Sequence, residues 1–247
     1  RFCQLFKYLS YKNCKKMKFL KDFFTLFYPE MCGICDQQLV ENEKTICTLC
    51  RHDLPLTNFT SFQENSVTQT FFGRVDIEKG YSLLHFRKKG ITQKIIHELK
   101  YRGNEEIGAF FGDWLGEIIR ENGEFKDVDY IIPVPLHPKK MKQRGYNQVT
   151  KFGKKVSGHL QIPYLENELV RVSATKTQTF KARFERFSNV DTRFLLKDIV
   201  CFKNKHVLII DDVITTGATL EACAKEFQKS NNCRISILTM ACSDLIV

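Results

Sequence analysis

The segment VLIIDDVITTGAT, residues 207–219, constrains the fold of this chain more than any other. Its four apolar residues 207–210 predict a strand that is buried on both faces and ends at two carboxylates, Asp211 and Asp212. The residues that follow are apolar at helical spacing, so a helix is expected to begin near Thr216. A buried strand leading directly into a helix is typical of an α/β sheet, which binds ligands at the carboxyl ends of its strands.

The loop between this strand and helix has the composition of an anion site. The first amides of a helix lack intrahelical partners and lie at its positive end, glycine lets the backbone approach a ligand, and threonine hydroxyls can donate further hydrogen bonds. The two carboxylates suit the 2'- and 3'-hydroxyls of a ribose, directly or through Mg²⁺. The segment therefore predicts a ribose 5-phosphate ligand, with the phosphate bound by Thr215, Thr216, Gly217, Ala218 and Thr219.

The plain alternative is a buried strand that ends in a polar turn with a threonine cap. Two adjacent acids followed by TTGAT are more than a cap requires, which favours the binding site. A P-loop is excluded because GKS and GKT are absent, and the lack of GxGxxG argues against a dinucleotide-binding fold.

Four cysteines near the amino terminus form the pattern C-x2-C-x11-C-x2-C. Two such pairs can complete the tetrahedral coordination that Zn²⁺ prefers, and because the protein would fill all four positions the metal is expected to be structural. The alternatives are four buried or disulfide-linked cysteines, and His52 could in principle replace one ligand. The predicted zinc ligands are Cys32, Cys35, Cys47 and Cys50.

Strand and helix patterns alternate through the rest of the chain, which predicts an α/β fold with a mostly parallel sheet flanked by helices. Helices are expected on either side of Arg102 and Gly103 and again in 147–160. Further strands are expected in 127–135, near LVRV, and in a final segment, CRISILTMAC.

Two basic loops are expected to face the same crevice as the TTGAT loop. The first, HPKKMKQRGYNQ, includes Lys142 and Arg144, and a guanidinium is well suited to paired phosphate oxygens. The second spans 171–190 and, as a long loop, is a candidate lid over the ligand. A solvated basic turn and an ordinary connection are the respective alternatives. The candidate lid residues are Lys176, Gln178, Lys181, Arg183 and Arg186.

VLIIDDVITTGAT resembles the phosphoribosyl pyrophosphate (PRPP) signature of type I phosphoribosyltransferases. The cysteine pattern, LKYRGNEEIG, PVPLHPKKMKQRGYNQ and TQTFKARFERFSNV narrow the resemblance to the ComF family, zinc-finger and phosphoribosyltransferase-like proteins linked to DNA uptake. The resemblance implies ribose contacts from Asp211 and Asp212, pyrophosphate contacts from Lys142 and Arg144, and a mobile loop over PRPP. It also implies that Asp211, Asp212 and Arg144 serve displacement at the anomeric carbon, with Mg²⁺ on the leaving pyrophosphate.

Composition limits the partners without choosing among them. The net charge of +10 favours anionic ligands, which phosphorylated small molecules and nucleic acid both provide. The ten cysteines, mostly scattered in apolar segments, favour a reducing cytosol, and no apolar run reaches the roughly 20 residues of a membrane span. The expected layout is a basic leader at 1–26, in which Met17 could be the true start, a zinc ribbon at 27–57, a connecting segment at 58–81 and a phosphoribosyltransferase-like domain at 82–247.

Three functional hypotheses remain open on the sequence alone. The first is a nucleobase phosphoribosyltransferase that uses PRPP. The second is a non-catalytic module that senses a nucleotide and binds single-stranded DNA through basic and aromatic side chains. In the third, the zinc ribbon recruits a protein partner such as a helicase of the uptake machinery, as the family association suggests.

Overall fold

The computed structural model describes residues 27–173 and 192–243. The chain divides into two compact units, residues 1–52 and 53–247. In the described part of the first unit, isolated bridges pair Met31 with Gln38 and Lys44 with Ile46, and one short helix, α2 (Thr48–His52), follows. The two halves of the cysteine pattern are brought together by these turns.

A four-stranded parallel sheet forms the centre of the second unit, with the strand order β1-β6-β5-β2. The central strand β5 carries the signature segment, and its residues 207–210 are fully buried. A separate antiparallel pair joins β3 to β4. The strands are β1 (Lys79–Phe86), β2 (Tyr130–Pro133), β3 (Leu169–Ser173), β4 (Thr192–Leu196), β5 (His206–Ile214) and β6 (Arg234–Ser243).

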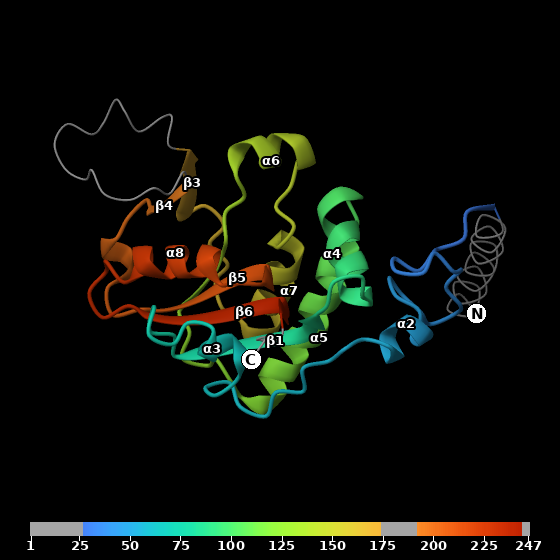
Figure 1. Cartoon of the computed structure of the whole chain (residues 1–247), viewed down its shortest axis with the longest axis horizontal. Helices are drawn as coiled ribbons and strands as arrows, with labels where there is room; N and C mark the ends of the chain where they lie inside the picture. The colour runs from blue at the N-terminus through green and yellow to red at the C-terminus, as the bar shows by residue number, and fades with distance from the viewer. Residues whose placement is uncertain (1–26, 174–191, 244–247) are drawn as a thin grey trace, which may run out of the picture. The chain divides into compact units, whose positions relative to one another are not determined.

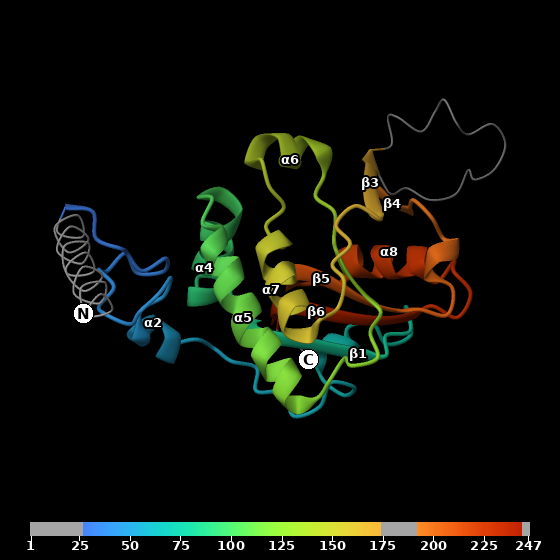
Figure 2. The same cartoon turned by 180° about the vertical axis from the view of Figure 1, so that it is seen from behind.

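Helices cover both faces of this sheet (Figures 1 and 2). Helices α4, α5 and α7 lie on one face, while α8 and the short α3 lie on the other, and α6 projects from the sheet on two long connections. The helices are α3 (Ser66–Gln69), α4 (Ile91–Tyr101), α5 (Glu105–Asn122), α6 (Pro138–Arg144), α7 (Thr150–Leu160) and α8 (Ala218–Phe227), with one 3-10 turn, η2 (Val200–Phe202).

Helices α5 and α7 pack closely because glycine faces the contact. A Cβ atom added to Gly112 would lie 2.5 Å from the carbonyl oxygen of Phe152, and one added to Gly116 would lie 2.8 Å from the His159 ring. Gly153 in turn lets α7 approach the sheet, where an added Cβ would meet Ile210. This close packing fixes the layer of helices against β5.

The segment before β1 takes part in the core of the second unit. Val67 of α3 is 0% exposed and Phe71 just after it is 1% exposed, and both belong to the hydrophobic cluster on the α8 side of the sheet. Asn65 caps α3 by accepting hydrogen bonds from the amides of Val67 and Thr68. The predicted connection at 58–81 thus contains a helix, part of the core and the start of β1.

The expected parallel sheet flanked by helices is confirmed, with three local differences. The strand near LVRV, β3, pairs with β4 outside the main sheet. The first basic loop contains a helix, α6, which begins with Pro138 at its first turn and is capped by the His137 ring. Helix α8 begins at Ala218, two residues later than expected, because Gly217 adopts a left-handed conformation before it.

No helix in the described part of the chain combines the length and the apolar composition that a membrane crossing needs.

Candidate functional site: the pocket between β5 and α8

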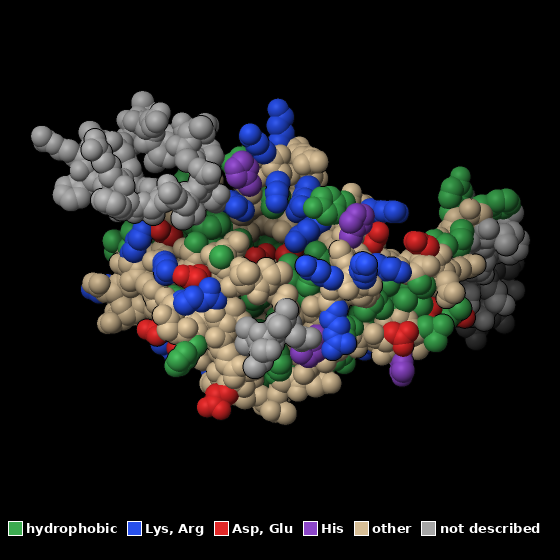
Figure 3. Space-filling model, viewed as in Figure 1, with side chains coloured by type: hydrophobic (Ala, Val, Ile, Leu, Met, Phe, Trp, Pro, Cys, Tyr) green, Lys and Arg blue, Asp and Glu red, His purple; other side chains and the backbone are tan. Residues whose placement is uncertain are grey.

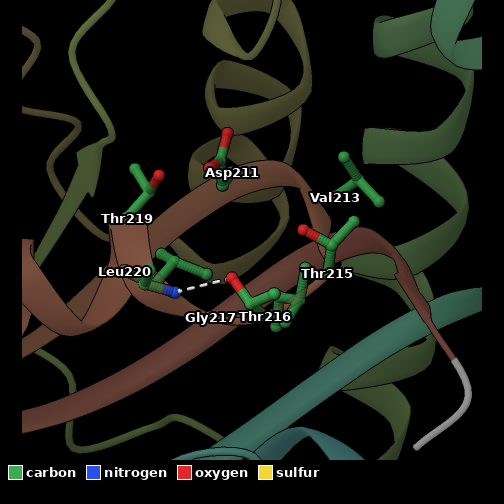
Figure 4. A pocket seen from close by; sticks show the side chains of 9 residues that line it. Asp211, Val213, Thr215, Thr216, Gly217, Thr219 and Leu220 are labelled. Carbon is green, nitrogen blue, oxygen red and sulfur yellow. Dashed lines mark hydrogen bonds between the residues drawn. The ribbon is translucent and has the colours of Figure 1, made fainter. Parts of the chain in front are cut away.

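A pocket lies where β5 passes into α8, and the signature segment forms its lining (Figure 4). The pocket is partly open, and about 260 Å³ of free space lies in it when the adjoining open solvent is included. Buried β5 residues anchor the start of the loop, and the buried Leu220 and Ala224 of α8 anchor its end. The lining residues are Asp211, Val213, Ile214, Thr215, Thr216, Gly217, Ala218, Thr219 and Leu220.

The loop leaves polar groups available at the start of α8. Thr215, Thr216 and Thr219 are exposed, and the amide of Ala218 donates only a long hydrogen bond, 3.5 Å, to the Thr216 hydroxyl (dashed line in Figure 4). The cap residue Gly217 supplies no side chain that could satisfy the first amides of the helix. The structure therefore gathers the five predicted phosphate residues around one pocket with donors suited to an anion.

Arg74, which lies shortly after α3, contacts this loop from a segment that is remote in the sequence. Its guanidinium donates a hydrogen bond of 3.1 Å to the carbonyl oxygen of Thr216 and forms an ion pair of 2.9 Å with Glu221 in the first turn of α8. A Cβ atom on Gly217 would lie 2.8 Å from Thr70, so the turn after α3 packs directly under the loop. Arg74 could not be identified from the sequence, since neither residue type nor spacing links it to the signature segment.

The two adjacent acids have different environments. Asp211 is partly exposed and lines the pocket, and its Oδ1 accepts a hydrogen bond of 2.8 Å from the amide of Asp212. Asp212 is 2% exposed, and its Oδ2 lies 2.8 Å from Nζ of Lys100 in an ion pair. Successive side chains of a strand point to opposite faces, which accounts for this separation.

Burial and the neighbouring Asp212 carboxylate raise the pKa of Asp211, while Lys100 and Arg171 act against the rise. A ligand that needs this carboxylate ionised must therefore compete with a proton. Arg171 of β3 is a second cation near the acids, and no sequence pattern pointed to it. Its Nε is buried and has no hydrogen-bond partner among the described residues.

The last turn of α4 links the acids to the predicted pyrophosphate residues. The Tyr146 hydroxyl donates a hydrogen bond of 2.5 Å to the carbonyl oxygen of Leu99, and the Arg144 guanidinium lies 5.2 Å from the centre of the Tyr101 ring. Arg144 also donates a hydrogen bond of 2.8 Å to Gln148. Arg144 and the exposed Lys142 do not line the pocket itself.

Figure 3 shows Lys and Arg side chains gathered over α6 and the neighbouring end of α4, around a hollow in which acidic side chains are visible. Lys139, Lys140 and Lys142 of α6 are all exposed. The candidate lid residues Lys176, Gln178, Lys181, Arg183 and Arg186 lie outside the described residues.

The amino-terminal cysteines form a four-thiol cluster whose sulfur atoms all lie within 4.8 Å of one another. Backbone amides point at two of the sulfurs: the Cys47 amide lies 3.3 Å from Cys32 Sγ, and the Cys50 amide lies 3.4 Å from Cys47 Sγ. Although burial acts to raise it, the amides of Cys47, Cys35 and Ile34 lower the pKa of Cys32 to about 7. Four converging sulfurs with amide donors fit Zn²⁺, and Cys32, Cys35, Cys47 and Cys50 would hold it.

The acid pair at the pocket does not fit Mg²⁺ in the same way. Mg²⁺ binds through carboxylate oxygens together with several waters in an octahedral shell. Asp212 is buried and already paired with a lysine ammonium, which leaves Asp211 as the one carboxylate of the pair that lines the pocket. The residues present therefore do not form a two-carboxylate magnesium site.

A second group of metal-binding residue types occurs at the opposite ends of these strands, where Glu78, Asp127 and His206 lie close together. Arg234 bridges the two acids at 3.0 and 2.7 Å, and the His206 ring is hydrogen bonded to Asp127 and Ser236. A guanidinium thus supplies the positive charge, and the group is an ion-pair network.

Comparison with known proteins gives a consistent set of relatives, although no family model matches the chain. Competence protein F of Haemophilus influenzae is 37% identical over 107 residues, which cover 43% of this chain and 47% of that protein. DNA utilization protein YhgH of Escherichia coli O157:H7 is 28% identical over 203 residues, 79% of this chain and 82% of that protein. Competence protein ComFC of Streptococcus pneumoniae is 24% identical over 202 residues, 81% of this chain and 76% of that protein.

Several solved structures with partial similarity to this chain are phosphoribosyltransferases. A purine phosphoribosyltransferase from Pyrococcus horikoshii is 21% identical with a TM-score of 0.34, covering 56% of this chain and 73% of that one. An adenine phosphoribosyltransferase from Leishmania tarentolae is 14% identical with a TM-score of 0.34, covering 56% of this chain and 71% of that one.

Proposed function

The chain belongs to the ComF family, and we propose that it binds the ribose 5-phosphate part of PRPP, or of a related nucleotide, between β5 and α8. The observation that carries this proposal is the pocket itself, in which one carboxylate faces a loop of exposed threonines and helix amides. A sugar phosphate needs an acceptor for its hydroxyls at one end and donors for its phosphate at the other, and the pocket offers both. As in the relatives named for competence and DNA utilization, the proposed biological setting is the uptake or use of DNA.

Within this proposal the residues of the pocket have distinct tasks. Asp211 accepts hydrogen bonds from the ribose hydroxyls, and the loop 215–219 binds the 5-phosphate. Arg74 keeps the loop in place by holding the Thr216 carbonyl, so that the neighbouring amides remain directed at the ligand. Lys142 and Arg144 are proposed to reach a pyrophosphate group from α6, as cations outside the pocket lining.

Calorimetric titration of the full chain with PRPP and with ribose 5-phosphate tests the proposal. The variant Asp211→Asn keeps the shape of the side chain but replaces one acceptor oxygen by an amide nitrogen that can only donate, and we expect it to weaken binding about tenfold, or about 1.4 kcal/mol. The matched control is Asp113→Asn, which alters an acid of α5 paired with Lys155 and should leave affinity unchanged. Wild-type protein without affinity for either ligand, or an unaffected Asp211→Asn variant, would refute the proposed site.

A separate assay decides between a transferase and a binding protein. The full chain is incubated with PRPP, Mg²⁺ and a panel of nucleobases, and pyrophosphate release is measured. Release that depends on one base and is abolished in Asp211→Asn identifies a phosphoribosyltransferase. Retained PRPP binding without release identifies a protein that senses the ligand.

A second function, binding of single-stranded DNA, is favoured by one specific observation. Helix α6 presents Lys139, Lys140 and Lys142 to solvent, and no acid occurs in the chain between Tyr130 and Leu165. An exposed cationic element of this kind can contact the phosphates of a flexible strand. From the family association alone, we also propose that the amino-terminal unit binds a protein partner such as a helicase of the uptake machinery.

A further inference from the structure

Lys100 forms an ion pair with one acid of the signature segment, although it belongs to a remote part of the chain. It lies in the last turn of α4, more than a hundred residues before the signature segment, and its Nζ lies 2.8 Å from Asp212 Oδ2. The Lys100 side chain is 22% exposed and that of Asp212 is 3% exposed. The contact is therefore a largely buried ion pair beneath the signature segment.

Asp212 depends on this contact for compensation of its charge. Among the described residues, Oδ2 has no hydrogen-bond partner besides the ion pair, whose geometry is not that of an aligned hydrogen bond. A buried carboxylate without a partner would be strongly unfavourable. Lys100 thus supplies the positive charge that a bound divalent cation would supply to a pair of carboxylates.

We propose that Lys100 is an internal counter-ion that occupies, on Asp212, the position a divalent cation would otherwise take. The ligand-free protein then binds Mg²⁺ weakly at this pair, and Asp211 is left alone to receive the ligand. The proposal deepens the proposed function by assigning the metal dependence of the same site, but its test needs no phosphoribosyl ligand.

The physical reason is competition for one carboxylate. A divalent cation at Asp212 would approach the Lys100 ammonium that is already paired with this acid, and the two positive charges would repel each other in a poorly solvated place. Metal binding at the pair is therefore expected to improve when Lys100 loses its charge.

Binding of Mn²⁺, measured by the electron paramagnetic resonance signal of the free ion, tests this on the full chain. Mn²⁺ prefers oxygen ligands and reports on carboxylates without displacing a metal from the thiol cluster. We expect Lys100→Met to bind Mn²⁺ at least about tenfold more tightly than the wild type. Lys100→Arg keeps the charge and Lys94→Met changes an exposed lysine of the same helix, so both should bind as weakly as the wild type.

The double variant Lys100→Met with Asp212→Asn assigns the effect to the acid, because the gain in Mn²⁺ affinity should disappear with the carboxylate. Unchanged affinity in Lys100→Met, or a gain that persists in the double variant, would overturn the proposal. Loss of PRPP binding in calorimetry alongside the expected Mn²⁺ pattern would count against the proposed function alone.

Lys100→Met leaves a buried charge unpaired and could unfold, so thermal unfolding with increasing Mn²⁺ provides a second measurement. The midpoint of Lys100→Met should rise with Mn²⁺, and that of the double variant should not. Equal responses of the two variants would contradict the proposal. The proposal would also be contradicted if the Lys100→Met chain stayed unfolded in saturating Mn²⁺ while the double variant folded.

Discussion

At the scale of single residues, the two adjacent acids of the signature segment have different environments. Sequence reasoning assigns Asp211 and Asp212 the same role because they are chemically identical neighbours. Strand geometry separates them: Asp211 meets the pocket, while Asp212 is buried against Lys100. A sequence pattern cannot express this difference, since it depends on what packs against each face of β5.

Gly217 illustrates how one residue can be required for two reasons. Its φ of +76° favours glycine, and an added Cβ would lie 2.8 Å from Thr70 and 3.0 Å from Phe71. We expect Gly217→Ala to lower the free energy of unfolding by more than the ~1 kcal/mol of left-handed strain alone, and to weaken ribose 5-phosphate binding. Chemical denaturation and calorimetry measure the two effects.

Gly145 provides a matched control for this prediction. Its φ is +81°, but an added Cβ would meet nothing within 4 Å, so Gly145→Ala reports the backbone strain without the steric contact. Equal destabilisation of the two variants would mean that the packing of the Thr70 turn under the loop has no measurable effect.

At the scale of elements, α4 and α6 show how short segments connect the pocket to its surroundings. The final turn of α4 contacts Asp212 through Lys100, Tyr146 through the Leu99 carbonyl, and Arg144 through Tyr101. The helical periodicity of α4 and α5 and the break between them were predictable, because local apolar spacing determines them. The contacts of the α4 end were not, because they join segments far apart in the sequence.

Binding of single-stranded nucleic acid is predicted to depend on the exposed lysines of helix α6. Replacing Lys139, Lys140 and Lys142 together by Gln should weaken binding of a single-stranded oligonucleotide. The slope of log affinity against log salt should fall by about 0.7 for each phosphate that these lysines no longer neutralise. Fluorescence anisotropy over a range of salt concentrations measures both quantities.

The control for α6 changes lysines on other helices. Lys154→Gln and Lys94→Gln remove exposed cations from α7 and α4. An equal weakening per lysine in the α6 and control variants would show that binding follows net charge and not this helix. A salt-independent affinity would exclude capture through phosphates.

At the scale of the whole molecule, the two units differ in what stabilises them. The second unit has an extended apolar core around β5 and β6, whereas the described part of the first unit has few buried apolar side chains and four clustered thiols. A small unit of this kind is expected to depend on a bound metal for its folding.

Elemental analysis of the full chain should therefore find one zinc per molecule. Cys47→Ser removes a buried sulfur from the cluster and should abolish zinc binding, after which limited proteolysis should cut within residues 27–52. Because the pocket proposed for ribose 5-phosphate lies wholly within the second unit, any affinity for PRPP should persist.

Cys201→Ser, which alters an exposed cysteine outside the cluster, is the control and should retain the metal. Zinc that survives Cys47→Ser in full, or disappears with Cys201→Ser, would contradict assignment of the site to the four clustered thiols.

The sequence by itself determined the alternation of strands and helices, the pairing of the cysteines and the position of the threonine-rich loop after β5. Each is encoded locally, by apolar periodicity or by residues a few positions apart, so each can be recognised without knowing the fold. Only the tertiary structure decided that β3 leaves the main sheet to pair with β4, that Arg74 holds the loop, and that Lys100 pairs with Asp212. These contacts bring together segments separated by tens to more than a hundred residues, and their chemistry depends on burial and distance, which arise only when the chain packs.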